Sequence, residues 1–176
     1  MTLDHSPNLD APASWARSNR ALPTAPAAIL KRLEAAYSLP QVMEIVTHSA
    51  RLLLAADGVT FVLRDGELCY YAEEDAISPL WKGSRFPMDM CISGWCMKQL
   101  QAVAIPDIYL DERIPHDAYR PTFVKSLAMV PVVQVDAIAA MGAYWAQRYD
   151  ASEADIVLLQ KIADSAAPAI ARILNA

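Results

Sequence analysis

The chain has 176 residues, of which 55% are hydrophobic, and its formal net charge is −5 at pH 7. This length suits one domain with a terminal extension, and the acidic balance disfavours nucleic acid as the main partner. No apolar run approaches the roughly 18 to 20 residues that a membrane span needs, so no span is expected. The first residues predict no secretory signal, and the three cysteines, an odd number, then favour reduced thiols and a cytoplasmic protein.

The N-terminal part of the chain predicts an arm followed by two helices. Residues 1–24 are rich in Pro, Ser, Asn and Ala and predict a flexible arm, which leaves residues 25–176 as the folded domain. Apolar residues at helical spacing predict one helix over 26–37 and a second over 40–56. The dipeptide Asp57-Gly58 predicts the turn that ends the second helix.

A β-hairpin is predicted next. Alternating apolar residues indicate strands over 59–64 and 67–72, and the dipeptide Asp65-Gly66 between them predicts the turn. Residues 73–90 show no clear periodicity, which predicts an irregular segment with a short strand around 84–86. The chain therefore changes from helices to strands before its midpoint.

The stretch Ile92–Pro131 is the most unusual part of the chain. Ser93 is expected to cap a short helix over 94–100, and the β-rich hexamer AVAIPD at 102–107 follows it. A polar and aromatic loop then leads to an apolar strand over 127–135. Loops of this length inside a compact domain are uncommon and usually functional, so this stretch is the strongest candidate for a functional site.

The remaining residues predict one more strand, over 137–146, and a long C-terminal helix. Ser152 can cap this helix, and Asp155 stands at its third position, close to a capping box. Pro168 lies inside the helix and should bend it. Helices at both ends with an antiparallel meander between them predict an α+β sandwich.

The motifs that would carry catalysis are missing. The five glycines are never closer than eight positions apart, so neither a P-loop nor a dinucleotide fingerprint can be built. A nucleophile elbow around Ser93 is half absent, because position 91 is a cysteine. No ligand pairs have zinc-like spacing, and His116 is the nearest imidazole to the cysteines. Neither an enzyme nor a metal site is expected.

The cysteines allow a redox interpretation. Cys91 and Cys96 flank Ser93 at the start of the predicted short helix, where a helix N-terminus lowers a thiol pKa. A thiol redox sensor using Cys91 and Cys96 is therefore one alternative function. The other interpretation is that both side chains, like Cys69 in its strand, pack as small hydrophobic groups.

The order of parts in the second half resembles the GAF domain, a small-molecule sensor module of bacterial signalling proteins such as sensor histidine kinases and phytochrome-related sensors. The sequence ISGW, then IPDIY, and the strands SLAMVPV and AMGAYW carry the resemblance, which covers residues 25–174. It implies a GAF-like α+β sandwich with a central antiparallel sheet. The N- and C-terminal helices would lie on one face, and residues 91–126 would form the lid of a ligand pocket on the other.

The pocket implied by this resemblance has candidate residues of two kinds. The aromatic candidates, which would form its walls, are Trp95, Tyr109, Tyr119, Phe123 and Trp145. The polar candidates, which would orient the ligand, are Asp107, Arg113, His116 and Arg120. The opposing interpretation is that the aromatic rings fill the core and the loop charges pair with each other, for example Arg113 with Asp111 or Asp117.

The ligand can be compared with four branches of the family. Cyclic-nucleotide-binding members carry an Asn-Lys pair that is absent here, and in the methionine-sulfoxide reductases a catalytic cysteine stands where this chain has Ser93. Tetrapyrrole-binding members resemble the DIY…PH…VKS region, and Cys91 is similar to an auxiliary cysteine in some of them. Pro115 stands where the cyanobacterial branch has its anchoring cysteine, so a covalent bilin is disfavoured, although Asp107 and His116 are compatible with a loosely held ligand. The sequence does not identify a cofactor. In the fourth branch the domain binds no ligand and serves as a dimerising scaffold.

Apolar residues outside the core stripe of the last helix, Val157, Leu158 and Leu174, favour a homodimer through the terminal helices. The expected function is a small-molecule-sensing regulatory domain of a bacterial two-component or related signal-transduction system. The ligand would be held under the 91–126 lid, and the signal would pass through the terminal helices to a histidine kinase or another output module. A ligand-free dimerising scaffold and the thiol redox sensor are the alternatives.

Overall fold

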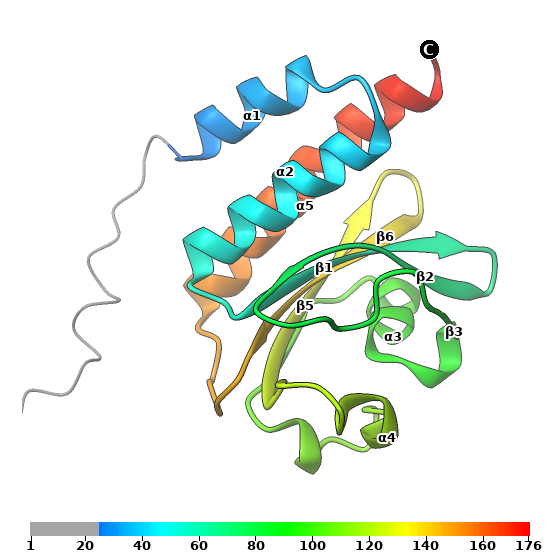
Figure 1. The fold of residues 1–176 in the computed structure, drawn as a ribbon. Coiled ribbons are helices and arrows are strands. Elements are labelled where there is room, and N and C mark those ends of the chain that lie inside the picture. The colour runs from blue at the N-terminus through cyan, green and yellow to red at the C-terminus, as the bar shows by residue number, and fades with distance from the viewer. Residues whose placement is uncertain (1–24) are drawn as a thin grey trace, which may run out of the picture.

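The computed structural model describes residues 25–176 (Figure 1). The predicted arm at 1–24 lies outside the described residues. A six-stranded antiparallel sheet forms the centre, with the strand order β3-β2-β1-β6-β5-β4. In that order the strands are β3 (Arg85–Pro87), β2 (Leu68–Ala76), β1 (Gly58–Asp65), β6 (Ala137–Trp145), β5 (Ser126–Val133) and β4 (Val103–Ile105). The predicted α+β sandwich is confirmed, but the predicted meander is wrong, because β1 pairs with β6 at the centre of the sheet.

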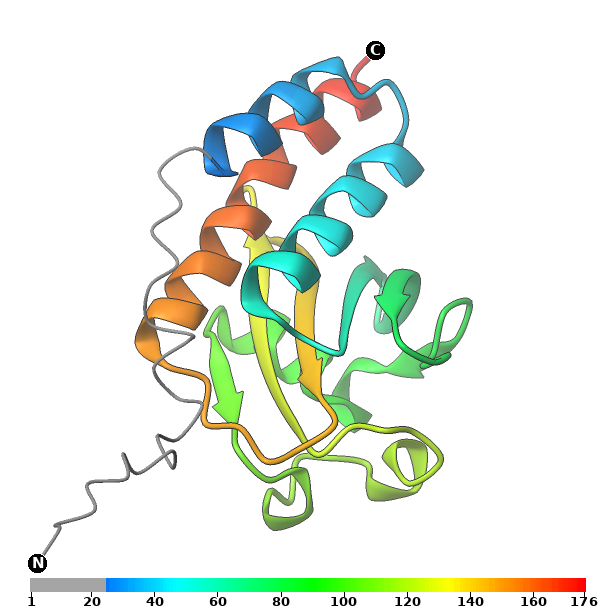
Figure 2. The same ribbon diagram turned by 60° about the vertical axis from the view of Figure 1, so that its left-hand side comes forward.

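The two faces of the sheet carry different layers. Helices α1 (Ala25–Ala35), α2 (Leu39–Leu54) and α5 (Glu153–Leu174) lie together on one face, as Figures 1 and 2 show. On the other face lie α3 (Ile92–Gln99) and α4 (His116–Tyr119), together with two 3₁₀ turns, η2 (Met88–Met90) and η3 (Ile108–Leu110). Among the described residues, no helix has both the length and the apolar composition that crossing a membrane would need.

Helix α2 ends earlier than the sequence predicted. Ala55 adopts the left-handed conformation, with φ 49°, and terminates the helix. The predicted exit turn at Asp57-Gly58 is therefore wrong. Gly58 is instead the first residue of β1, and a Cβ atom there would lie 2.9 Å from Cζ of Phe123. A small residue is needed because the lid packs closely against the start of this strand.

The predicted hairpin exists, with its turn shifted by one residue. Asp65 pairs with Leu68, so the two-residue loop is Gly66-Glu67, and Gly66 has a φ of +61°. A side chain at Gly66 would be strained in this conformation, which is typical of such hairpin turns. Strand β2 continues to Ala76, beyond the predicted end at 72.

Helix α5 begins as predicted. The hydroxyl of Ser152 accepts a hydrogen bond from the backbone N–H of Asp155 at 3.2 Å, and the Asp155 carboxylate accepts one from the backbone N–H of Ser152 at 2.9 Å. The capping box is thus confirmed, and Pro168 does lie inside the helix. Leu159, on the inner face of α5, is fully buried.

The protein has two hydrophobic cores, one on each side of the sheet. We call them the helix-side core and the lid-side core. The helix-side core is built mainly from aliphatic side chains, among them Val42, Val46, Val59, Val130, Val132, Leu159, Ile162 and Ile170. The lid-side core holds aromatic and sulfur-bearing side chains, among them Cys69, Tyr71, Trp81, Met88, Cys91, Cys96, Met97, Tyr119, Met129 and Tyr144.

Candidate functional site

The lid consists of residues 91–126 and covers the face of the sheet that the terminal helices leave free (Figure 1). Its first element is α3, which begins differently from the prediction. Cys91, not Ser93, is the N-cap residue, with an extended backbone, and Ser93 lies within the first turn. Gly94 is required because a Cβ there would collide with the carbonyl oxygen of Met88. The turn η2 thus crosses directly over the start of α3.

A small cluster of polar side chains lies within the lid-side core, which we call the thiol–hydroxyl cluster: Cys69, Tyr71, Cys91 and Ser93. Cys69 and Tyr71 are two residues apart on β2 and therefore point to the same face. The Ser93 hydroxyl lies 3.1 Å from the Tyr71 hydroxyl and 3.2 Å from Cys91 Sγ. All four side chains are buried.

The thiols of this cluster have perturbed and opposite acidities. A hydrogen bond from the Cys69 thiol lowers the pKa of Cys91, and together with the Ser93 hydroxyl and the backbone N–H groups of Ser93 and Gly94 it outweighs burial, which raises this pKa. The same hydrogen bond, together with burial, raises the pKa of Cys69. Burial alone raises the pKa of Cys96. Of the two thiols in the cluster, Cys91 is therefore more acidic than Cys69.

Trp81 fills the centre of the lid-side core. Its ring centroid lies 5.5 Å from that of Tyr71, 4.7 Å from that of Tyr119 and 5.6 Å from that of Tyr144. The indole N–H donates a hydrogen bond of 3.1 Å to the carbonyl of Ala118 in the lid. Trp81 thus connects the segment after β2 with the lid.

The segment that carries Trp81 is held by a single carboxylate. Glu74 of β2 accepts hydrogen bonds of 2.9 to 3.0 Å from the backbone N–H groups of three consecutive residues, Leu80, Trp81 and Lys82. Such an arrangement fixes the path of an irregular segment without regular secondary structure. No sequence pattern predicts this anchor, because Glu74 resembles an ordinary surface residue.

Two of the tyrosines around Trp81 differ in their hydrogen bonding. The Tyr144 hydroxyl lies 2.9 Å from the Thr60 hydroxyl. The Tyr119 hydroxyl is buried and has no hydrogen-bond partner among residues 25–176. Burial raises the pKa of both phenols. Tyr119 is therefore a neutral, unsatisfied polar group inside the lid-side core.

The polar candidates at the start of the lid are engaged with the protein itself. Asp107 caps η3 by accepting a hydrogen bond of 3.0 Å from the backbone N–H of Tyr109, and its other oxygen lies 2.5 Å from Arg148. Arg113 forms two hydrogen bonds with Asp111, at 2.9 and 2.6 Å, which lower the pKa of this carboxyl.

The remaining lid candidates form local contacts. The guanidinium carbon of Arg113 lies 4.4 Å from the ring centroid of Trp95. His116 Nε2 lies 3.0 Å from the carbonyl oxygen of Ile108, and its ring lies 5.7 Å from the ring of Tyr109. Arg120 is exposed and pairs with Asp117 at 2.6 Å.

The structure does not bring all of the sequence-predicted candidates together. Phe123, at the end of the lid, is partly buried against the lid-side core, and its ring lies close to Gly58. Trp145 lies in the helix-side core, where its ring is 4.6 Å from that of Tyr149, and its indole N–H has no hydrogen-bond partner in the described part of the chain. Strand alternation explains the position of Trp145, because Tyr144 faces the lid and the next residue of the strand must face the helices.

Several residues of the lid-side core lie outside the set of predicted site residues, although the sequence already offers Trp81 and Tyr144 as possible cavity walls. These are Tyr71, Trp81 and Tyr144, with Cys69 and Ser93 of the thiol–hydroxyl cluster. The i, i+2 spacing of Cys69 and Tyr71 was the signal available for two of them. Within residues 25–176, no group of three or more His, Cys, Asp or Glu side chains could hold a metal ion.

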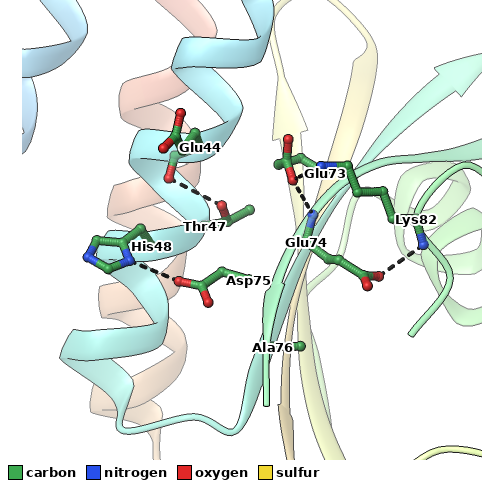
Figure 3. Close-up of a pocket in the computed structure, with 8 residues that line it drawn as sticks. All are labelled: Glu44, Thr47, His48, Glu73, Glu74, Asp75, Ala76 and Lys82. Carbon is green, nitrogen blue, oxygen red and sulfur yellow. Dashed lines mark hydrogen bonds and ion pairs between the residues drawn. The ribbon is translucent and has the colours of Figure 1, made fainter. Parts of the chain in front are cut away.

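A hollow with a volume of about 500 Å³ lies between α2 and β2, away from the lid (Figure 3). Its charged groups pair with each other: His48 Nδ1 lies 2.9 Å from the Asp75 carboxylate, and Lys82 Nζ lies 2.5 Å from Glu73. Burial would raise the pKa of Asp75, but hydrogen bonds from His48 and Arg51 outweigh it and lower the pKa. Ion pairs therefore line this groove, and the pair of His48 with Asp75 joins helix α2 to strand β2.

The model of the family described as GAF domain matches residues 36–171 of the chain. Among solved structures, the GAF domain of an Acinetobacter phosphoenolpyruvate-protein phosphotransferase has a TM-score of 0.75 at 16% identity, covering 86% of this chain and 93% of that one. The free methionine-R-sulfoxide reductase of Neisseria meningitidis, in complex with its substrate, has a TM-score of 0.76 at 14% identity, covering 98% and 99%. At these identities the similarity concerns the fold. No curated protein matches the sequence.

Proposed function

Because the chain belongs to the GAF domain family, whose members are typically small-molecule-binding regulatory domains of signalling proteins, we propose that it senses a small molecule beneath its lid. In this proposal the chain is the regulatory domain of a bacterial signal-transduction system, such as a two-component system, and acts in the cytoplasm. It is not a catalyst. The ligand contacts the lid-side core, and the terminal helices pass the signal to an output partner.

The observation that carries this proposal is the unpaired hydroxyl of Tyr119. Leaving a buried polar group without a hydrogen bond costs roughly 1 to 3 kcal/mol, so such a group needs a reason. A ligand with one hydrogen-bonding atom would satisfy it. The neighbouring Tyr71, Ser93 and Tyr144 hydroxyls, in an otherwise apolar and aromatic surrounding, would give this ligand orientation.

Trp81 gives the site a means of opening. Its ring now occupies the centre of the aromatic group, and one side-chain hydrogen bond, to Ala118, connects it to α4. We propose that the ligand displaces this ring and shifts the lid between two conformations. Within this site Trp95, Tyr109, Arg113 and His116 would form the rim, as side chains of the lid itself.

Five sequence-predicted residues take different places in this proposal. Tyr119 becomes the central contact, Phe123 holds the end of the lid to the start of β1, and Asp107 holds its middle to Arg148. Arg120 stays at the surface with Asp117. Trp145 is left out of the ligand contacts, because its ring lies in the helix-side core.

The output would pass through the helices on the opposite face. Strands β1, β5 and β6 contribute residues to both cores, so a change beneath the lid can reach α2 and α5 through the sheet. Leu30, Val157 and Leu174 are 45% to 67% exposed on α1 and α5. We propose a homodimer through these helices, with a histidine kinase or another output module as partner.

One observation favours the alternative of a ligand-free dimerising scaffold. The lid charges that could hold a ligand pair with each other, Arg113 with Asp111 and Arg120 with Asp117. In the scaffold, Trp81 stays in place as a permanent part of the core. The two functions predict the same fold and the same dimer, and they differ in whether a small molecule is bound.

Native mass spectrometry of the protein purified from bacterial cells tests the proposal. A bound metabolite would appear as excess mass that disappears on denaturation, and Tyr119→Phe should reduce the bound fraction about tenfold, because it removes the hydroxyl that the ligand satisfies. Tyr37→Phe is the matched control, since this tyrosine is 79% exposed. A protein free of ligand that also shows no thermal shift with a panel of common metabolites would favour the scaffold.

A further inference from the structure

We propose that Cys69 and Cys91 form a peroxide-reactive dithiol in which Cys91 attacks the peroxide and Cys69 resolves the product into a disulfide. This site lies in the thiol–hydroxyl cluster. It goes beyond ligand sensing, and its test does not depend on whether the ligand proposal is correct.

The pairing of strands β2 and β3 brings the two cysteines together. Cys69 pairs with Phe86, and Leu68 pairs with Pro87, in the register of this ladder. Cys91 follows a few residues later, and its thiol lies 3.5 Å from the carbonyl oxygen of Pro87. The chain thus returns to β2 beside Cys69, and Ser93, which lies 3.2 Å from Cys91 Sγ, also lies 3.1 Å from the hydroxyl of Tyr71, two residues from Cys69 on the same face of β2.

The surroundings of Cys91 favour its thiolate. Its Sγ lies 3.2 Å from the Ser93 hydroxyl, at the N-terminal end of the eight-residue helix α3. The backbone N–H groups of Ser93 and Gly94 and the helix dipole place positive potential at this end. The thiolate is the nucleophilic form of cysteine, so Cys91 is the attacking residue of the pair.

Cys96 does not share this environment. Its thiol donates a hydrogen bond of 3.1 Å to the carbonyl of Gln101, at the C-terminal end of α3. The pairing of Cys91 with Cys96, suggested by their closeness in sequence, is therefore replaced by the pairing of Cys91 with Cys69. Cys96 becomes a buried cysteine outside the reactive site and a suitable control.

The chemistry balances with a hydroperoxide, ROOH, as the oxidant. The Cys91 thiolate attacks the terminal oxygen, the O–O bond breaks, and the departing alkoxide takes a proton and leaves as an alcohol. Cys91 is then a sulfenic acid. The Cys69 thiol loses its proton and attacks Cys91 Sγ, and the S–O bond breaks. The departing hydroxide takes that proton and leaves as water, so two thiols and one peroxide give a disulfide, an alcohol and water.

The products would also change the lid. Cys91 is the N-cap residue of α3, and its thiol is one of the two hydrogen-bond neighbours of Ser93. A disulfide to β2 would remove this contact and join the start of the lid covalently to the sheet. The oxidised protein would therefore have a lid that opens less easily.

Peptide mapping of the full chain after treatment with hydrogen peroxide tests the proposal. The native wild-type protein should lose two of its three thiols and yield one cross-linked peptide pair containing Cys69 and Cys91. A disulfide between Cys91 and Cys96, a disulfide between two copies of the chain, or three unreactive thiols would overturn it. This measurement uses no variant, so misfolding of a mutant cannot obscure the answer.

Variants then assign the two roles. Cys69→Ser should stop at a Cys91 sulfenic acid, which dimedone traps. Cys91→Ser should slow thiol loss by about tenfold or more, and Cys96→Ser should behave as the wild type. If Cys91→Ser folds, as judged by circular dichroism, and still loses thiols at the wild-type rate, Cys91 is not the attacking residue.

Discussion

The helix-side core and the lid-side core lie on opposite faces of one sheet, yet they are built from different side chains. Among its fully buried members the helix-side core has neither a tyrosine nor a cysteine, whereas the lid-side core contains all three cysteines of the chain and three tyrosines. Aliphatic side chains pack densely and need no hydrogen bonds. Thiols and phenols bring polar atoms into the interior that require partners. The difference indicates that one face of the sheet supplies stability and the other supplies chemistry.

Leu159→Ala should have the largest effect and test the stability role of the helix-side core. Leu159 is fully buried in α5, and truncating such a side chain costs roughly 2 to 5 kcal/mol of unfolding free energy. Urea denaturation followed by circular dichroism measures this cost. Val157→Ala, on the exposed side of the same helix, is the control and should cost less than about 1 kcal/mol. Similar losses in both variants would contradict this division of roles.

The pH dependence of Cys91 alkylation tests the chemical role of the lid-side core. The lowered pKa of Cys91 means that its thiolate persists as pH falls through the ordinary thiol range and is lost only below it. Cys69→Ser should raise this pKa and slow alkylation at neutral pH by about tenfold.

Mass spectrometry of the alkylated peptide gives the rate at each pH. The titratable groups that surround Cys91 are Cys69 and Tyr71 from β2, Tyr119 from α4 and Tyr144 from β6. Their pKa values are all raised, so they stay neutral at neutral pH and leave Cys91 as the group that titrates. An alkylation rate that follows the ordinary thiol range in the wild type would contradict the prediction.

Two matched tyrosine variants should move stability in opposite directions. Tyr144→Phe removes the hydrogen bond to Thr60 and should lower the unfolding free energy by about 1 kcal/mol. Tyr119→Phe removes an unpaired buried hydroxyl and should leave stability unchanged or raise it by up to about 1 kcal/mol. Urea denaturation of ligand-free protein measures both. Equal losses would mean that the Tyr119 hydroxyl already has a partner, and the ligand proposal would lose its main support.

The smallest effect is expected at the ionic contact between α2 and β2 (Figure 3). The lowered pKa of Asp75 makes its stabilising contribution complete above the ordinary carboxyl range, and this contribution is lost as pH falls through the lowered value. Asp75→Asn should therefore cost at most about 1 kcal/mol at pH 7 and nothing in strong acid. Urea midpoints against pH measure this, with the exposed Asp150→Asn as control. A cost that is independent of pH would exclude the ionic origin.

Much of the fold could be predicted from the sequence, because local patterns specify local structure. The Ser152–Asp155 capping box involves residues three positions apart, and the apolar stripe of α5 repeats at helical spacing, so neither depends on the rest of the chain. The central antiparallel sheet followed from the resemblance of ISGW, IPDIY and the two later strands to GAF domains. These features were confirmed.

The site could be predicted only in part, because it depends on which face each side chain reaches. Trp145 and Tyr144 are both large aromatic residues, and the register of β6 alone sends the first to the helices and the second to the lid. A shift of one residue reverses this assignment. In the β1–β2 ladder Phe61 pairs with Glu73 and Val62 with Tyr71, so Ala72 is an extra residue of β2 that makes such a shift, and nothing in the local sequence indicates it.

By itself, the sequence determined the elements, their order and the family, since these depend on residues close together along the chain. The tertiary structure decided which residues, distant from each other in the sequence, come into contact. Cys91 is five positions from Cys96 and twenty-two from Cys69, yet the β2–β3 ladder brings it to Cys69, and α3 directs Cys96 toward Gln101. Contacts between distant residues depend on strand register and helix orientation, which no short pattern contains. The chemistry of the lid-side core is therefore visible only once the sheet has formed.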